Sequence, residues 1–191
     1  MQTQQNSSIA YSEKVALAKS YLCKMNPAYQ MQICHNEKDC LMGQYPTLAE
    51  INKGYGQTMA MAWLVPQLLD LSEYCGCKEK LNQHQMRGLA YIIATDFFYL
   101  KVSELMLFFH RFKSGRYGKF YGSVDPLVIT KALREFVVER SNAIDRYENE
   151  ERRQKLEEEM KHAVTWQEYC KMNDMPERAD ESPLKLLTLQ P

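Results

Sequence analysis

Cations alternate with aromatic side chains between His110 and Tyr121, in a segment rich in glycine, and this mixture is the part of the sequence best suited to binding a ligand. No acidic residue lies between Glu104 and Asp125. Guanidinium and ammonium groups neutralise phosphates, and rings stack on bases, so the segment predicts contact with nucleic acid. Glycines would also let backbone amides approach a phosphate. The candidate nucleic-acid-binding residues are Arg111, Lys113, Arg116, Tyr117, Lys119 and Tyr121.

A structural role fits the same segment, and the sequence leaves both open. Cations complement the C-terminus of a helix, Gly115 can end that helix, and the aromatic residues of the loop, with Phe112 and Phe120 among them, can fold back onto the core. The run from Gly115 to Lys119 is not a phosphate-binding Walker A loop, because the glycine spacing and the Lys-Ser/Thr pair are missing. The question is therefore whether this loop faces a ligand or only turns the chain.

Two groups of soft ligands suggest a metal site, but their spacing does not fit one. Cys34, His35 and Cys40 form one group, and Cys75 with Cys77 forms the other. A zinc site usually shows two C-x₂₋₄-C pairs, whereas these are C-x₅-C and C-x-C. We expect structural thiols and no metal.

Catalysis and cofactor binding are not indicated. None of the four histidines lies in a nucleophile, metalloprotease or kinase motif. Asp96 falls at the margin of an apolar helical stripe, where a carboxylate is more often the partner of an arginine or a helix end than a catalytic group. We predict no catalytic residue, no cofactor and no small-molecule ligand.

Composition bounds the class of protein. Of 191 residues, 45% are hydrophobic and 25% are charged, as in a globular protein. The longest nearly apolar stretch, Met59 to Leu69, is about half the length that crosses a bilayer, so no membrane segment is expected. Without an export signal, the six cysteines are interpreted as reduced thiols of a cytoplasmic protein. Net charge is zero, which argues against a protein that coats DNA.

Apolar periodicity predicts an all-α protein, an irregular bundle of about six or seven helices with a long exposed C-terminal helix. We expect a short N-terminal helix ending near Met25, a loop over 27–45, and helices beginning at the caps Thr47, Asn82, Ser103, Asp125-Pro126 and Thr165. The helix from Asn82 should reach Leu100. The predicted regions are an N-terminal helix and loop, weakly anchored, over 1–44; a helical core over 45–145; and a charged helix with a flexible tail over 146–191.

Two C-terminal features have open interpretations. The Glu/Arg-rich stretch over 148–161 has too few apolar positions for a sustained coiled coil, and solvated helix is the simpler interpretation. The tail could dock onto another protein or pack on its own core. Its apolar residues are Leu184, Leu186, Leu187 and Leu189.

Part of the chain resembles uncharacterised small helical proteins from bacterial phage and mobile-element gene sets. Glu104-Leu105, Phe108-Phe109, the glycine-rich run 115–122 and Asp125-Pro126 carry the resemblance, which covers about residues 45–145. It implies a setting in replication or mobilisation, and it transfers no activity and no catalytic residue.

The sequence therefore suggests a non-enzymatic accessory protein that associates with nucleic acid or a replication protein through residues 111–121. The alternative is a protein–protein adaptor that uses its acidic helix and leucine-bearing tail. The sequence indicates no oligomeric state.

Overall fold

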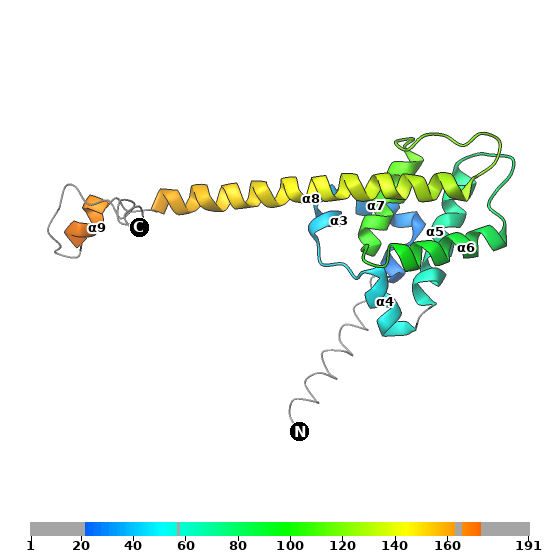
Figure 1. The fold of residues 1–191 in the computed structure, drawn as a ribbon, viewed down its shortest axis with the longest axis horizontal. Helices are drawn as coiled ribbons and strands as arrows, with labels where there is room; N and C mark the ends of the chain where they lie inside the picture. Colours follow the sequence, from blue (N-terminus) through cyan, green and yellow to red (C-terminus); the bar gives the residue numbers. More distant parts are fainter. Residues whose placement is uncertain (1–21, 57, 163–165, 173–191) are drawn as a thin grey trace, which may run out of the picture. The chain divides into compact units, whose positions relative to one another are not determined.

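The computed structural model describes residues 22–56, 58–162 and 166–172, and this part of the chain is all-α (Figure 1). Pairing between extended segments is limited there to two isolated bridges, Thr47–Lys101 and Glu79–Ser123. The predicted all-α fold with a long C-terminal helix is confirmed. The helices are η1 (Pro27–Tyr29), α2 (Gln30–Cys34), α3 (Glu37–Met42), α4 (Leu48–Tyr55), α5 (Met59–Tyr74), α6 (Gln83–Asp96), α7 (Val102–Lys113), α8 (Pro126–His162) and α9 (Trp166–Met172).

The chain divides into two compact units, Met1–Tyr147 and Glu148–Pro191. The first unit contains the hydrophobic core. In the second, residues 148–150 and 152–161 of α8 are exposed. Most of the N-terminal helix expected to end near Met25, the cap at Thr165 and the leucine-bearing tail lie outside the described residues.

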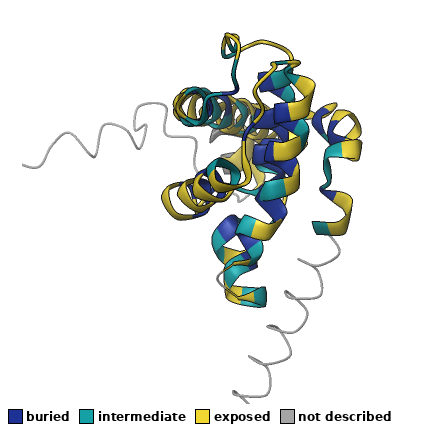
Figure 2. Cartoon of the chain, turned by 90° about the vertical axis from the view of Figure 1, so that its right-hand side faces the viewer, coloured by how far each residue is buried: buried dark blue, intermediate teal, exposed yellow. Residues whose placement is uncertain are grey.

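Helix α7 is the centre of the core. Ten of its twelve residues are buried, and the side chains of Phe108 and Phe109 are fully buried. A helix that is apolar on nearly all sides has to be surrounded by other elements. Helices α2, α3 and α5 pack directly on α7, and Phe136 of α8 contacts the ring of Phe108 at a centroid distance of 5.6 Å. In Figure 2 the helices of this unit carry buried residues toward one another and exposed residues outward.

Three of the helix starts follow the predicted caps. Thr47 Oγ1 accepts from the amide of Glu50 at 3.2 Å, and the Glu50 carboxylate accepts from the amide of Thr47 at 2.9 Å. Asn82 and Gln85 repeat this capping box at 2.9 and 3.0 Å. Asp125 Oδ1 accepts from the amide of Leu127 at 2.8 Å, and α8 begins at the predicted proline.

The prediction that Ser103 caps a helix is wrong. Helix α7 begins two residues earlier, with Lys101 as its cap, and the amide of Lys101 donates to Glu104 Oε2 at 2.9 Å. Ser103 is buried inside the helix, and its hydroxyl donates to the carbonyl of Cys40 at 2.8 Å. The Ser103 side chain therefore does not cap α7 and instead forms a hydrogen bond to α3.

The predicted loop over 27–45 is also wrong, because this stretch forms η1, α2 and α3. The helices are too short to show a 3.6-residue period. Asparagine caps mark two of their starts: Asn26 Oδ1 accepts from the amide of Ala28 at 2.9 Å, and Asn36 Oδ1 accepts from that of Asp39 at 3.1 Å. The carbonyl of Met25 accepts two bonds from α5. The donors are Trp63 Nε1 at 2.7 Å and Gln67 Nε2 at 3.0 Å.

Helix α6 ends at Asp96 and not at Leu100 as predicted. After it the backbone turns and pairs with the start of α4, where the amide of Leu48 donates to the carbonyl of Leu100 at 3.0 Å. The amide of Ala49 donates to the carbonyl of Phe98 at 2.9 Å. Leu100 is fully buried in the turn, so the apolar period continues past the end of the helix.

A buried ion pair joins α7 to α8. Glu104 is fully buried, and Arg140 Nε lies 2.8 Å from its Oε1. Burial raises the pKa of Glu104, although the amide of Lys101 and the guanidinium of Arg140 act in the opposite direction. The folded protein thus binds a proton at the Glu104 carboxyl group more tightly than the unfolded chain does. Its stabilising contribution is lost as pH rises from the ordinary carboxyl pKa through the raised one.

We predict that Arg140→Ala lowers the free energy of unfolding by about 3 kcal/mol near neutral pH, because it leaves a buried carboxylate without its partner. The loss should shrink at pH values below the raised pKa, where Glu104 takes up a proton. Urea denaturation at several pH values measures both effects. Arg134→Ala, an exposed arginine on the same helix, is the control and should change stability by less than about 0.5 kcal/mol.

Candidate functional site

The glycine-broken segment that follows α7 links it to α8 (Figure 1). Gly115 has φ +83°, a left-handed conformation that glycine adopts without strain and that reverses the chain here. The amide of Arg116 then donates to the carbonyl of Arg111 at 3.2 Å. Further along, Val124 and Gly122 exchange backbone hydrogen bonds with Glu79 at 3.0 and 3.3 Å. Both ends of the segment are therefore fixed.

Arg111, the first predicted cation, lies inside the protein. It is 8% exposed, and its guanidinium is 2.7 Å from Glu37 Oε2 on α3 and 3.3 Å from Glu139 Oε2 on α8. Desolvation opposes its charge, but the bond to Glu37 raises the pKa of Arg111 overall. Two carboxylates from two helices thus compensate one buried charge, which joins α3, α7 and α8.

Two of the other three predicted cations also have carboxylate partners. The ammonium of Lys113 pairs with Asp70 on α5 and lies 5.5 Å from the ring centroid of Tyr74. Arg116 Nε is 3.1 Å from Glu139 Oε1, with half of the arginine side chain exposed. Lys119 is exposed and has no acidic partner in the part of the chain that the structure describes.

The aromatic residues of the segment are likewise of two kinds, those packed on the core and one exposed to solvent. Tyr117 packs on Phe108 at a centroid distance of 5.7 Å, and its hydroxyl donates to Glu139 Oε2 at 3.0 Å. Burial is the main cause that raises the pKa of Tyr117, and the bond to the Glu139 carboxylate raises it further. Phe120 stacks on Phe112 at 5.3 Å. Tyr121, in contrast, is 90% exposed.

The six predicted nucleic-acid-binding residues therefore do not form one surface of free cations and rings. Arg111, Lys113 and Tyr117 hold the core together, and Arg116 shares a carboxylate with two of its neighbours. Lys119 and Tyr121 face solvent. The acids that neutralise the segment come from positions far from it in the sequence, so the local pattern could not reveal them.

Among the described residues, the thiols, His35 and Asp96 are not gathered into a metal-binding group. Cys34 and Cys40 are buried, while His35 is exposed. Asp96 is exposed and accepts from Thr95 Oγ1 at 3.3 Å. Within the described ranges, no three His, Cys, Asp or Glu side chains come together as ligands for a metal ion. In the same ranges, no helix combines the length and the apolar character that would let it cross a membrane.

An exposed apolar surface on α6 was missed by the sequence analysis. We call it the α6 face and define it as Gly88, Tyr91, Ile92, Thr95, Phe98 and Tyr99. All six residues are exposed. The first four lie on α6 opposite its buried stripe, and Phe98 and Tyr99 follow the end of the helix. The spacing 88, 91, 92, 95 repeats the helical period, so a second apolar stripe was the signal that could have found it.

The chain belongs to a family of unknown function, DUF6633, whose model matches residues 80–180. The matched region includes α6, α7, the glycine-broken segment and α8. No curated protein and no solved structure matches the chain. Because the function of this family is unknown, the match assigns no activity to the chain.

We predict that Tyr117 and Glu139 are energetically coupled by about 1 kcal/mol, because the phenol donates to a carboxylate in a half-buried position. Urea denaturation of Tyr117→Phe, Glu139→Gln and the double variant gives this coupling. The matched cycle with Glu135→Gln, an exposed acid one turn earlier on α8, should give a coupling near zero. Equal couplings in the two cycles would contradict the assignment.

Proposed function

We propose that the protein is a non-enzymatic adaptor that binds a protein partner through the α6 face. The observation that carries the proposal is the exposure of large apolar side chains at one place. Tyr91 is 58% exposed, Ile92 38%, Phe98 52% and Tyr99 40%. Tyrosine and phenylalanine are enriched in protein interfaces, and they supply much of the binding energy there.

The rest of the α6 face is also suited to contact with a protein. The hydroxyl of Thr95 is already bonded to the carbonyls of Tyr91 and Ile92, at 2.9 and 3.3 Å, so the residue can present its methyl group. Gly88 has no side chain to hold a partner away. Phe98 and Tyr99 contact each other edge to face at 5.7 Å and extend the surface past the end of the helix.

The size of the α6 face supports the same proposal. An aromatic side chain offers about 150–250 Å². At the exposed fractions given above, the three rings leave on the order of 300 Å² in water. The largest apolar patch on an ordinary monomer measures about 300–600 Å² and is often functional, so this exposed area reaches the lower end of that range. The surface is large enough to anchor a partner.

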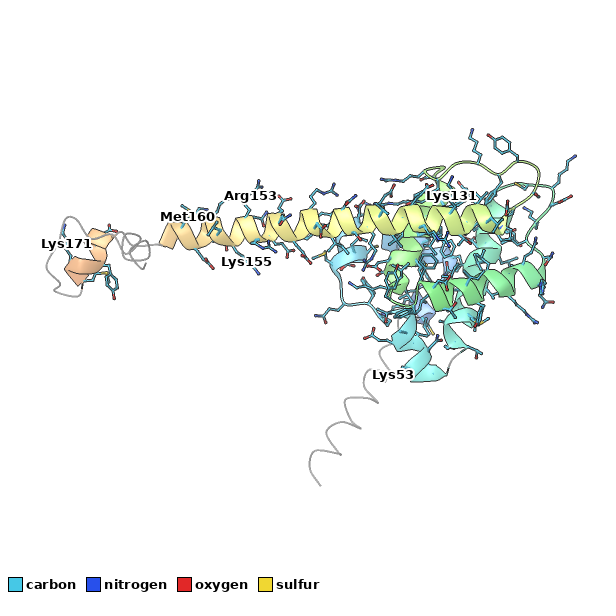
Figure 3. All side chains as sticks on the ribbon, viewed as in Figure 1. Lys53, Lys131, Arg153, Lys155, Met160 and Lys171 are labelled. Atoms are coloured by element: carbon cyan, nitrogen blue, oxygen red, sulfur yellow. The ribbon has the colours of Figure 1, made fainter. Side chains whose placement is uncertain are left out.

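The exposed part of α8 supplies a second feature of an adaptor. Residues 148–162 remain helical, supported by ion pairs of Arg153 with Glu150 at 3.5 Å and with Glu157 at 3.7 Å. Leu156 and Met160, one turn apart, are 56% and 68% exposed. Figure 3 shows the side chains of Arg153, Lys155 and Met160 directed away from the helix axis. This stretch is the acidic helix that the sequence-based adaptor hypothesis named.

We predict that a photoreactive amino acid at position 92 captures a protein partner in the cells that produce the chain. The adduct should disappear in the Tyr91→Ala/Tyr99→Ala variant, because the rings that anchor the partner are gone. Tyr74→Ala is the matched control: Tyr74 is 63% exposed but lies outside the α6 face, so the adduct should persist. Mass spectrometry identifies the captured protein.

The same probe at Leu127, which is 76% exposed on α8, sets the background. Adducts at position 92 that match those at 127 would contradict the proposal. Urea denaturation of the double variant should show a change of no more than about 1 kcal/mol, since both rings are largely in water already.

A second candidate function, nucleic-acid binding, is favoured by the exposure of Lys119 and Tyr121. Arg116, half exposed, could join them. Arg116 and Lys119 are then the two cations of the segment that could contact phosphates. The binding constant should therefore fall only slowly with salt, with a slope of log K against log [salt] of about −1.4 on single strands.

The adaptor proposal predicts no salt-sensitive binding in a fluorescence anisotropy titration with single-stranded DNA and RNA oligonucleotides at several salt concentrations. Binding that weakens with salt and is lost in Arg116→Ala/Lys119→Ala would replace the adaptor proposal with the nucleic-acid one. Arg152→Ala/Lys155→Ala, which removes two exposed cations from the second unit, is the charge-matched control.

A further inference from the structure

Helix α6 is poor in charge for a helix with an exposed side. Among the described helices it packs chiefly on α5, and the α6 face lies opposite its buried stripe. With histidine neutral, the charged residues of α6 are Arg87 near its start and Asp96 at its end, and both are exposed. Between them, the exposed residues of the helix are uncharged. Charged residues are depleted in the same way from the centres of protein interfaces.

The order of residues on the α6 face suits pairing with a second copy of the same face. Gly88 and Thr95 lie two turns apart along its middle, and Tyr91 and Ile92 lie between them on opposite flanks. A twofold axis between positions 91 and 92 would bring an antiparallel second copy against this face. Gly88 of each copy then lies opposite Thr95 of the other, while the two Tyr91 rings meet on one flank and the two Ile92 side chains on the other.

Gly88 is the position that permits close approach. A Cβ added there would have no atom of the chain within 4 Å, so the space above this glycine is open. The small Thr95 of the second copy would fill that space. Because a glycine and a threonine alternate with larger side chains, the two helices would interdigitate along the face.

The charges of α6 favour the antiparallel orientation over the parallel one. Asp96 is the last residue of the helix, where the partial charge of the backbone is already negative. An antiparallel neighbour brings its positive N-terminal end, which also carries Arg87, to this place. A parallel neighbour would bring like charges and like helix ends together.

The residues beyond the helix complete the same arrangement. Phe98 and Tyr99 follow the end of α6, so antiparallel pairing brings them to the first turns of the second copy. The exposed side chains there include His84 and Arg87. A guanidinium that lies over a ring is attracted to it, and polar side chains at this place would form the rim of the interface.

We propose that the partner of the α6 face is a second copy of the chain, bound as an antiparallel helix pair with a twofold axis between Tyr91 and Ile92. The inference rests on the proposed function, because it names the partner of the same surface. The rings of two copies contribute about 600 Å². A standard interface buries about 1,600 Å² in total, so this dimer belongs to the weak, reversible class. We expect a dissociation constant in the micromolar range.

Sedimentation equilibrium of the purified full-length chain tests the pairing, and we expect a monomer and a dimer in exchange. Gly88→Arg should raise the dissociation constant of the dimer by at least about tenfold, because the long side chain separates the two helices. The monomer should remain folded, as checked by circular dichroism, since the position is open. Asn142→Arg adds the same charge at an exposed position of α8 and should leave the constant unchanged.

A mixture of two variants tests the register of the pair. Gly88→Arg and Thr95→Glu each disturb both 88–95 contacts of a homodimer, so each variant alone should stay monomeric. In the mixed dimer the new arginine meets the new glutamate at one contact, and the natural glycine and threonine meet at the other. The mixture should therefore dimerise at least about tenfold more tightly than either variant alone. No gain on mixing would contradict the antiparallel pair.

The photoreactive amino acid at position 92 separates this inference from the proposed function. In the purified chain it should give an adduct of twice the chain mass. The inference is overturned if the natural chain stays monomeric well above micromolar concentration, or if its dimer is insensitive to Gly88→Arg and Thr95→Glu. Capture of a different protein in cells would then leave the proposed function standing, whereas capture of no protein by this probe in cells would remove both.

Discussion

A helix surrounded on all sides can carry charge only when other helices supply the opposite charge, and this constraint organises the first unit. Helix α7 is apolar over most of its length, yet it contains Glu104 and Arg111 in buried positions. An isolated charge in such a place costs several kcal/mol, so each must meet a counter-charge. Arg140 of α8 meets Glu104, and Glu37 with Glu139 meets Arg111. The positions of α3 and α8 against α7 are fixed by these pairs as well as by the rings between them.

The same constraint explains why the basic segment after α7 is less available than its sequence suggests. Cations that pair with buried or half-buried carboxylates cannot also bind phosphates without leaving those carboxylates unpaired. Local sequence shows only one side of each pair, because Glu37 precedes Arg111 by many residues and Glu139 follows it by many. The structural interpretation of the segment, with aromatic residues folded onto the core, applies to Phe112, Tyr117 and Phe120, whereas Tyr121 faces water.

Features governed by neighbouring residues could be predicted from the sequence, and features governed by distant ones could not. The capping boxes at Thr47 and Asn82 and the proline start of α8 depend on side chains within three residues of each helix end. Ser103, in contrast, donates to a carbonyl of α3 and does not cap α7, and its neighbours in the sequence give no sign of that distant acceptor. The short helices before Leu48 lack a period of their own, and the α6 face is recognised only once its opposite side is known to be buried.

The two hydrogen bonds that converge on the carbonyl of Met25 make one tryptophan an intrinsic reporter of the N-terminal segment. Trp63 is 8% exposed, and its indole N–H is bonded to a backbone oxygen from the segment that precedes η1. Release of that segment from α5 would return the indole to water and shift its emission to longer wavelength. Attachment of residues 22–34 to the core can therefore be followed by fluorescence in the natural chain, without a label.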